Sequence, residues 1–471
     1  MKKEVLRINR LSLTEKDTAG LTDVSLCLLE GESCGFLGLE NSGKHMMVDV
    51  LCGERLWNKG SVYIDGHVVT DKKTYKKSTY YANVSNFFVE DWLVAEYIGL
   101  EYTKFPFGIL REKPLVHQVK LLMKEIGLGL RVDERVKELS ELEKRQMDLV
   151  KAYQRGARIL IIEDEFEGCT VKDIEKYKEI LNRLIKKGGM TAIINSHSDQ
   201  VSQILSDKFI IFKEGSIVKK CKKNYIKSDA HLEQFLLRQR TTSSKINLER
   251  NNNIQDNSKE ILYAVSKIFL KKKKELKFHF RKGEITSILI LDIELGKKIF
   301  RLLSGREINP TVLVKLEGET CNFRKTTDYV KHKIVSSEGL GDSKEMFLTL
   351  SVGENLIISS LDKISIWSYP ISKYRLEKMA EKQIRHSLTD VKTSIKEMEV
   401  NDYITLLLER WYIYKPKVVV LFEPFNQCDM RGISMIKMYL KKFAEMGTTI
   451  IIIKSRDEYI EDISDHIVRI L

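Results

Sequence analysis

Short apolar runs alternate with amphipathic segments along the chain. One such run lies within Arg158–Glu163, and it is followed by the amphipathic segment Val171–Lys187 and a second apolar run, Thr191–Asn195. The apolar runs have the length of strands, and the apolar residues between them recur with the period of a helix. Continuously apolar strands separated by helices predict a parallel sheet covered on both faces, and therefore an α/β fold.

This order of features occurs twice. Gly31-Glu32 and Gly283-Glu284 each precede an apolar run, and Ser206-Asp207-Lys208 is matched by Ser464-Asp465-His466 at a nearly constant offset. A repeat of this length indicates two copies of one domain. We predict a first domain over residues 1–239, a polar linker over 240–258 and a second domain over 259–471.

Composition sets the broad class of the protein. The chain has 471 residues, of which 43% are hydrophobic, so it can bury sizeable cores and is neither disordered nor fibrous. Apolar runs such as Ile450–Ile453 fall far short of the ~20 residues of a membrane span, and we expect no cleaved secretory signal because the first residues contain no sustained apolar stretch. The seven cysteines are scattered without a CxxC pair. We therefore expect a cytoplasmic protein without membrane insertion, disulfide framework or metal site.

The net charge does not change the predicted class of protein. The formal net charge is +13, but the basic residues are spread along the chain and their densest run is Lys271–Lys274. Such a run is more often a solvated surface than a nucleic-acid patch, and no motif resembles a nucleic-acid reader. No nucleic-acid partner is expected.

The most specific motif is a glycine-rich loop between an apolar run, Cys34–Leu37, and a helical segment, Met46–Cys52. Its spacing is GxxxxGK, in which backbone N–H groups and the helix N-terminus bind phosphate and the lysine adds a positive charge. The position after the lysine should be Ser or Thr for Mg²⁺, but it is His45, a poor ligand for that ion. The alternative is a strand-to-helix turn without a ligand. The candidate nucleotide-binding residues are Gly38, Asn41, Ser42, Gly43, Lys44 and His45.

Together with its surroundings, the loop resembles the ATP-binding cassette (ABC) family, and more narrowly the tandem ATP-binding subunits of ribose/galactose-type monosaccharide importers. The resemblance covers nearly the whole chain. It implies two RecA-like ABC domains, each with a helical subdomain, which in the first copy spans about Tyr97–Gln146. It also implies ATP as cofactor and membrane permease subunits as partners, with the protein at the inner face of the membrane. The residues that carry it are Gly31-Glu32, Gly38–His45, Gly60–Gly66, Leu139–Met147, Ile159–Glu165, Ser196-His197, Leu350–Asn355, Trp411, Pro416–Pro424 and Ser464-Asp465.

The resemblance also assigns candidate catalytic residues. Glu163 takes the position of the metal-holding Asp and Asp164 that of the catalytic base, although a shift by one residue would give these roles to Asp164 and Glu165. His197 takes the position of the switch histidine that contacts the γ-phosphate. The alternatives are acids that end a strand at a solvated edge and an ordinary turn histidine.

Several family motifs are eroded. The first signature, Ser140–Glu143, has lost its glycines and reads as a helix-capping box, S-x-x-E. The segment Asn83–Phe88 lacks the expected glutamine. In the second copy, acids enter the phosphate loop at Asp292 and Glu294, and the metal-holding position is Phe422. The second signature region, Met398–Asp402, is acidic as well.

These losses decide the predicted function. The family resemblance implies composite sites in which Lys44 would face Glu399 and Asp402 of the other copy. We expect an importer-type subunit that binds ATP weakly in the first domain only, without a suitable Mg²⁺ site, and with little or no hydrolysis. The alternative is a soluble pseudo-ATPase that acts as a regulatory or protein-interaction module, and a competent ATPase is the least favoured reading.

Overall fold

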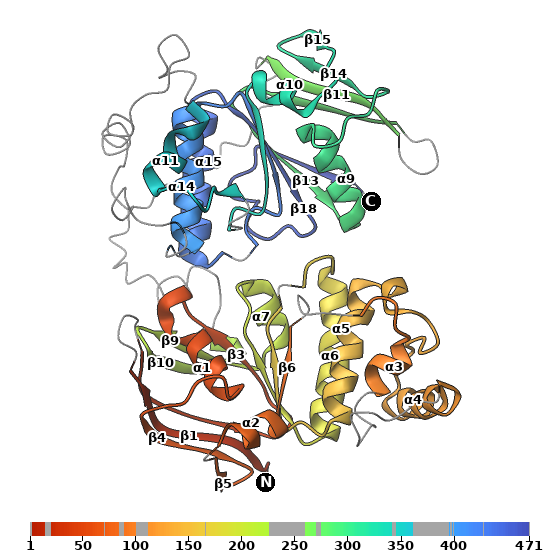
Figure 1. Ribbon diagram of the computed structural model, residues 1–471, viewed down its shortest axis with the longest axis vertical. Coiled ribbons are helices and arrows are strands. Elements are labelled where there is room, and N and C mark those ends of the chain that lie inside the picture. Colours follow the sequence, from red (N-terminus) through yellow and green to blue (C-terminus); the bar gives the residue numbers. More distant parts are fainter. Residues whose placement is uncertain are drawn as a thin grey trace. The chain divides into compact units, whose positions relative to one another are not determined.

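The structure is a computed structural model (Figure 1). It describes residues 2–14, 20–69, 71–83, 89–99, 112–164, 166–225, 260–269, 275–341, 345–360, 395, 398, 400–426 and 428–470. The predicted linker 240–258, the basic run Lys271–Lys274, most of the segment Asn83–Phe88, and Glu165 and Glu399 lie outside these residues. The chain divides into two units, Met1–Arg240 and Thr241–Leu471.

The first unit contains two sheets. The smaller is antiparallel, with strand order β2-β1-β4-β5, and the larger has the order β10-β9-β3-β8-β7-β6. In the larger sheet all neighbouring strands are parallel except β9 and β10. The strands are β1 Glu4–Leu13, β2 Leu21–Leu29, β3 Ser33–Leu37, β4 Lys59–Ile64, β5 His67–Val68, β6 Thr79–Ala82, β7 Ile159–Ile162, β8 Thr191–Ile194, β9 Lys208–Lys213 and β10 Ser216–Lys222.

The large sheet of the first unit is buried on both faces, as the apolar pattern predicts. In β7, Ile159 and Ile161 belong to the core shared with the antiparallel sheet and α1, whereas Leu160 and Ile162 belong to the core under the other helices. The helices are α1 Lys44–Leu51, α2 Lys72–Ser78, α3 Val94–Gly99, α4 Glu112–Ile126, α5 Glu141–Gln154, α6 Val171–Lys187 and α7 Asp199–Leu205.

The second unit repeats this strand order. Its antiparallel sheet has the order β12-β11-β14-β15, and its parallel sheet has the order β16-β17-β18-β13-β19. Read from the other edge of the first unit's sheet, β6-β7-β8-β3-β9 is the same arrangement. The strands are β11 Ile261–Phe269, β12 Glu275–Arg281, β13 Ile285–Ile290, β14 Leu313–Leu316, β15 Glu319–Cys321, β16 Ile334–Glu338, β17 Val418–Phe422, β18 Thr449–Lys454 and β19 His466–Ile470.

The parallel sheet of the second unit is likewise covered on both faces. Ile450 and Ile452 of β18 face one apolar core, and Ile451 and Ile453 face the other. Helices α11, α14 and α15 share one apolar core with this sheet, whereas α9, α10 and the antiparallel strands belong to the core on its other face (Figure 1). The helices are α9 Ile293–Ser304, α10 Thr326–Lys331, α11 Val352–Ile357, α14 Val400–Tyr414 and α15 Met430–Glu445.

The fold class is therefore the predicted one, an α/β architecture with two RecA-like units. The helix predicted over Val171–Lys187 is confirmed residue for residue. Near the candidate site, one helix and one strand have boundaries that differ from the predicted ones. Helix α1 begins at Lys44 rather than Met46, because Gly43 turns the chain with φ +92° and the next residue is already helical. Strand β8 ends at Ile194, so Asn195 lies in the loop beyond it.

In the part of the chain that the structure describes, no helix is both long and apolar enough to cross a membrane.

Candidate functional site

The glycine-rich loop of the first unit joins β3 to α1. The chain leaves β3 at Leu37, forms the short 3-10 helix η1 (Glu40–Ser42) and enters α1 through Gly43. Gly43 has a left-handed φ of +92°, and a Cβ on it would lie 3.0 Å from the Cα of Gly215. A Cβ on Gly38 would lie 2.3 Å from the Ser42 Oγ. Both glycines are therefore required by the conformation of this loop.

The loop keeps features that suit a phosphate group. Lys44 is the first residue of α1 and is only 2% exposed, so its charge lies at the helix N-terminus, where the backbone dipole favours anions. The Ser42 hydroxyl is buried and has no hydrogen-bond partner among the described residues. An orphaned buried hydroxyl costs free energy unless a ligand or water satisfies it. A triphosphate therefore fits this loop.

Glu163 lies at the end of β7 and accepts hydrogen bonds from three side chains. Its Oε1 lies 3.1 Å from the His45 Nδ1 and 2.5 Å from the Asn195 Nδ2. Its Oε2 accepts a hydrogen bond from the Tyr81 hydroxyl. An ionised carboxylate can only accept, so His45 donates to it in the tautomer that carries the proton on Nδ1; the Asn195 Nδ2 lies 3.2 Å from the same nitrogen.

This network keeps Glu163 ionised. Burial raises the pKa of Glu163, but the hydrogen bonds from His45 and Tyr81 outweigh burial and lower it below its ordinary value. Burial, together with the bond to Glu163, raises the pKa of the Tyr81 hydroxyl, so that it stays a donor. The expected magnesium ligands are thus an imidazole that donates a proton and a carboxylate already bound by three donors. Mg²⁺ needs oxygen lone pairs, so these residues do not fit it.

His197 lies beside His45, with the two rings stacked at 5.3 Å between centroids. It is half-buried in the loop after β8 rather than on the surface. Burial, and then the nearby charge of Lys44, hold the pKa of His197 well below its ordinary value, so its ring is neutral at pH 7. A neutral imidazole can still donate or accept one hydrogen bond at the position predicted for the γ-phosphate.

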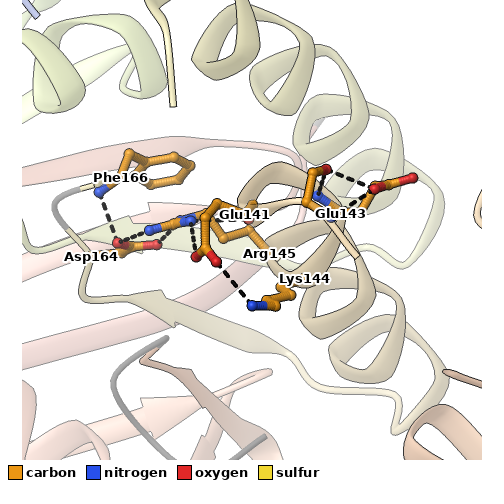
Figure 2. Close-up of polar contacts among 7 residues, drawn as sticks. Glu141, Glu143, Lys144, Arg145, Asp164 and Phe166 are labelled. Carbon is orange, nitrogen blue, oxygen red and sulfur yellow. Dashed lines mark hydrogen bonds and ion pairs between the residues drawn. The ribbon is translucent and has the colours of Figure 1, made fainter. Parts of the chain in front are cut away.

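Asp164 points away from this network and pairs with Arg145 of α5 (Figure 2). Its Oδ2 lies 2.5 Å from the Arg145 Nε, and its Oδ1 accepts from the Arg145 Nη2 at 3.0 Å and from the Phe166 N at 2.7 Å. Both side chains are nearly buried, with 3% and 7% exposed. Burial lowers the pKa of Arg145, but attraction to Asp164 outweighs it, and the guanidinium stays charged.

The two acids at the strand end are therefore not at a solvated edge. Figure 2 shows the Asp164 carboxylate facing the Arg145 guanidinium, with Glu141 on the other side of the arginine. A bidentate pair of this kind fixes both partners, and breaking it leaves a buried charge without compensation. In the structure Asp164 forms an ion pair with Arg145. Its role as a catalytic base remains a prediction.

The first signature region forms the capping box that the sequence predicts. The Ser140 side chain accepts a hydrogen bond from the Glu143 N, and the Glu143 carboxylate accepts one from the Ser140 N at 2.9 Å. Glu141 contacts Lys144 and Arg145 (Figure 2). The two carboxylates of the first signature region, Glu141 and Glu143, thus lie in the first turn of α5 and stabilise it.

In the second unit, the loop between β13 and α9 ends in a residue that caps the helix. Asp292 is the N-cap of α9, and its carboxylate accepts hydrogen bonds from the Glu294 N and Leu295 N at 3.0 and 3.1 Å. These are the amides that a phosphate would bind at a helix N-terminus. The chain therefore supplies its own anion there.

The metal-holding position of the second unit is apolar. Phe422, the last residue of β17, is 7% exposed and packs on α9, where its ring lies 5.8 Å from that of Phe300. A Cβ on Gly296 would come within 3.2 Å of the Phe422 ring. An aromatic ring packed against the helix that follows the loop cannot hold a cation such as Mg²⁺.

Glu423 survives in the second unit, but it binds the protein itself. Its Oε1 accepts hydrogen bonds from the Ser455 N and Oγ at 2.6 and 2.7 Å. Its Oε2 lies 3.7 Å from the buried Lys454 Nζ. Glu423 also has a left-handed φ of +45°, a strained conformation that these contacts hold in place.

The sequence did not identify three residues of the first unit's site. Tyr81 and Asn195 bind Glu163, and Arg145 binds Asp164. A polar residue directly after an apolar strand was a possible signal for Asn195. No local pattern distinguishes Arg145 from its neighbour Lys144, or Tyr81 from Tyr80, because only the packing of distant elements selects them.

Comparison with known protein families supports the resemblance in the first unit. Residues 21–166 match the ABC transporter family. This segment includes the loop from Gly38 to His45, the capping box at Ser140 and both acids after β7.

Known relatives match nearly the whole chain. The arabinose import ATP-binding protein AraG of Mannheimia succiniciproducens is 23% identical, over 98% of this chain and 92% of that protein. The galactofuranose transporter ATP-binding protein YtfR of Escherichia coli is 24% identical, over 99% and 93%. The solved structure of cbiO1 from Clostridium perfringens, part of an ABC transporter complex, is 16% identical with a TM-score of 0.43, over 50% of this chain and 94% of that one.

Proposed function

We propose that this chain, a tandem ABC protein resembling sugar-importer ATP-binding subunits, binds ATP weakly in its first unit and hydrolyses it slowly or not at all. The two units differ at the loop and at the strand end where the nucleotide would bind. In the first, the loop around Lys44 keeps the glycines, the buried lysine and the helix N-terminus that a phosphate needs. In the second, Asp292 caps α9 with its own carboxylate and Phe422 takes the place of the metal-holding acid.

The contacts of Asp164 support slow hydrolysis or none. The Asp164 carboxylate, at the position of the catalytic base, accepts three hydrogen bonds, two of them from a nearly buried Arg145. A general base must be within reach of the proton that it removes and must have a free lone pair to accept it. Asp164 would have to leave Arg145 uncompensated to do so, which costs about 3–5 kcal/mol for a buried pair.

The test is a parallel measurement of ATP binding and ATP turnover by the full chain. We expect measurable binding with turnover well below about 1 s⁻¹, the lower end of ordinary enzymes. Turnover at or above that rate would contradict the proposal.

A double substitution, Arg145→Gln with Asp164→Asn, tests the role of the pair without leaving a lone buried charge. We expect any residual turnover to be unchanged. If Asp164 were the base, its loss would lower the rate by about 10²- to 10⁴-fold. The single variant Glu143→Gln, which changes a carboxylate on the neighbouring capping box, is the matched control for changes in charge.

The relatives AraG and YtfR are described as import and transporter ATP-binding proteins. By this similarity we propose membrane permease subunits as partners, with the chain at the inner face of the membrane. The second candidate is a pseudo-ATPase module without a permease, favoured by the self-contained contacts of the second unit. Purification of the full chain from detergent-solubilised membranes separates them, because only the first predicts a co-purifying membrane protein.

A further inference from the structure

A network of four side chains occupies the region where the ABC resemblance places a metal ion. His45 follows the loop lysine, Glu163 follows β7, Asn195 follows β8, and Tyr81 belongs to β6. The four come from separate parts of the sequence and meet around one carboxylate. We propose that nucleotide binds to the first unit without a divalent cation, because this network replaces the metal site.

The distance between His45 and Glu163 does not by itself show whether a metal ion could bind between them. The 3.1 Å between the His45 Nδ1 and the Glu163 Oε1 is also the spacing of two neighbouring ligands around one Mg²⁺ ion. The chemistry of the donors does decide it. The Asn195 amide and the Tyr81 hydroxyl both present hydrogen to the carboxylate, whereas a cation needs lone pairs from every neighbour.

The network also occupies most of the lone pairs with which the Glu163 carboxylate can accept hydrogen bonds or bind a cation. A carboxylate has about four lone-pair positions, and three of them face His45, Asn195 and Tyr81. Asn195 is only 1% exposed, so its amide is held in place by packing and cannot turn aside without cost. A cation would have to displace these donors, and the buried Asn195 amide would lose its hydrogen bond to Glu163.

Positive charge for a phosphate remains without a metal. Lys44 lies at the N-terminus of α1 beside the loop, and His45 is the next residue. The Lys44 ammonium and the N-terminus of α1 can balance part of the charge of a free nucleoside triphosphate. The ligand class that the site fits is therefore a nucleotide not complexed by a metal.

This inference rests on the proposed function, since it concerns how the same site takes its ligand. The experiment is calorimetric titration of the full chain with ATP, once in EDTA and once in excess Mg²⁺. We expect binding in Mg²⁺ to be no tighter than in EDTA. Binding that is tenfold or more tighter in Mg²⁺ would overturn the inference and leave the proposed function standing. Binding in neither condition would overturn the proposed function, and the inference with it.

A double variant, His45→Ser with Glu163→Asp, restores the ligands that the family uses and serves as the positive comparison. We expect its ATP affinity to rise at least tenfold on adding Mg²⁺. The matched control is Lys298→Ser with Phe422→Asp at the corresponding positions of the second unit, for which we expect no metal dependence. Metal independence of the first double variant would overturn the inference, because the network would then not be what excludes the metal.

Discussion

The loops that precede α1 and α9 occupy the same place in two repeated folds, yet different groups lie at the N-termini of the two helices. The loop between β3 and α1 keeps Gly38, Gly43 and a buried lysine at its helix N-terminus. The loop between β13 and α9 binds its own Asp292 carboxylate at the corresponding amides. The two copies share a fold but differ in the side chain at the helix N-terminus, which is a buried lysine in the first unit and a carboxylate that caps its own helix in the second.

The same contrast holds at the strand ends beside these loops. In the first unit, a carboxylate is retained and bound by three polar side chains. In the second, a phenyl ring packs on the helix that follows the loop. Hydrogen bonds hold the residue at this position in the first unit, and apolar contacts hold it in the second.

The largest expected effect comes from removing the aromatic side chain of the second unit. Phe422→Ala deletes a buried ring between β17 and α9 and should lower the free energy of unfolding of that unit by about 3–5 kcal/mol. Denaturant unfolding of the full chain measures it. Phe422→Leu, which keeps most of the volume, is the control and should lose much less. Equal losses for the two variants would mean that the ring does not fill this space.

The next largest effect separates the two loop lysines. Lys44→Ala removes a charge at the N-terminus of α1 and should weaken ATP binding about 10- to 100-fold, as expected for a hydrogen bond to a charged group. Lys297→Ala, at the corresponding position of the second unit, should leave it unchanged. Lys297 is instead 3.8 Å from Glu294 on the same helix. Loss of binding in the Lys297 variant would show that both loops hold nucleotide.

A smaller effect is expected at the cap of α9. Asp292→Ala leaves two helix amides without an acceptor and should cost about 1 kcal/mol in the unfolding of the second unit. Asp292→Asn keeps an equally good cap and should cost little. If both variants were equally unstable, the role of Asp292 would be its charge rather than its hydrogen bonds.

The smallest effect concerns the charge around His197. Removing the positive charge in Lys44→Gln should raise the pKa of His197 toward its ordinary value of about 6.5, because Lys44 opposes protonation of the ring. Burial, the larger cause, remains, so the rise is partial. The ring-proton shift of His197, followed by nuclear magnetic resonance against pH, measures it. A pKa of His197 unchanged in Lys44→Gln would leave burial and the neighbouring His45 as its causes.

The same depressed pKa sets a pH dependence of stability. The unfolded chain binds a proton to this histidine more readily than the folded unit does. The free energy of unfolding therefore falls as the pH drops below about 6.5 and continues to fall down to the folded pKa. In His197→Gln this part of the pH dependence should vanish.

Local features of the fold follow closely from the sequence. The helix Val171–Lys187 begins at a capping box of Thr170 with Asp173 and ends at a glycine, signals that lie within a few residues. The capping box at Ser140 is equally local and is confirmed. The cap at Asp292 was also readable, as an acid directly before a helix, but it was interpreted only as an unfavourable charge.

The sequence alone determined the repeat, the alternation of strands and helices and the position of the phosphate loop, because these depend on periodicity and on hydrogen bonds between close neighbours. Only the tertiary structure decided that Glu163 meets His45, 118 residues away, and that Asp164 meets Arg145 instead. Two adjacent acids at the end of a strand point to opposite sides, and what each one meets depends on how α1, α5 and the neighbouring strands pack. The chemistry of the first unit's cleft is set by those long-range contacts.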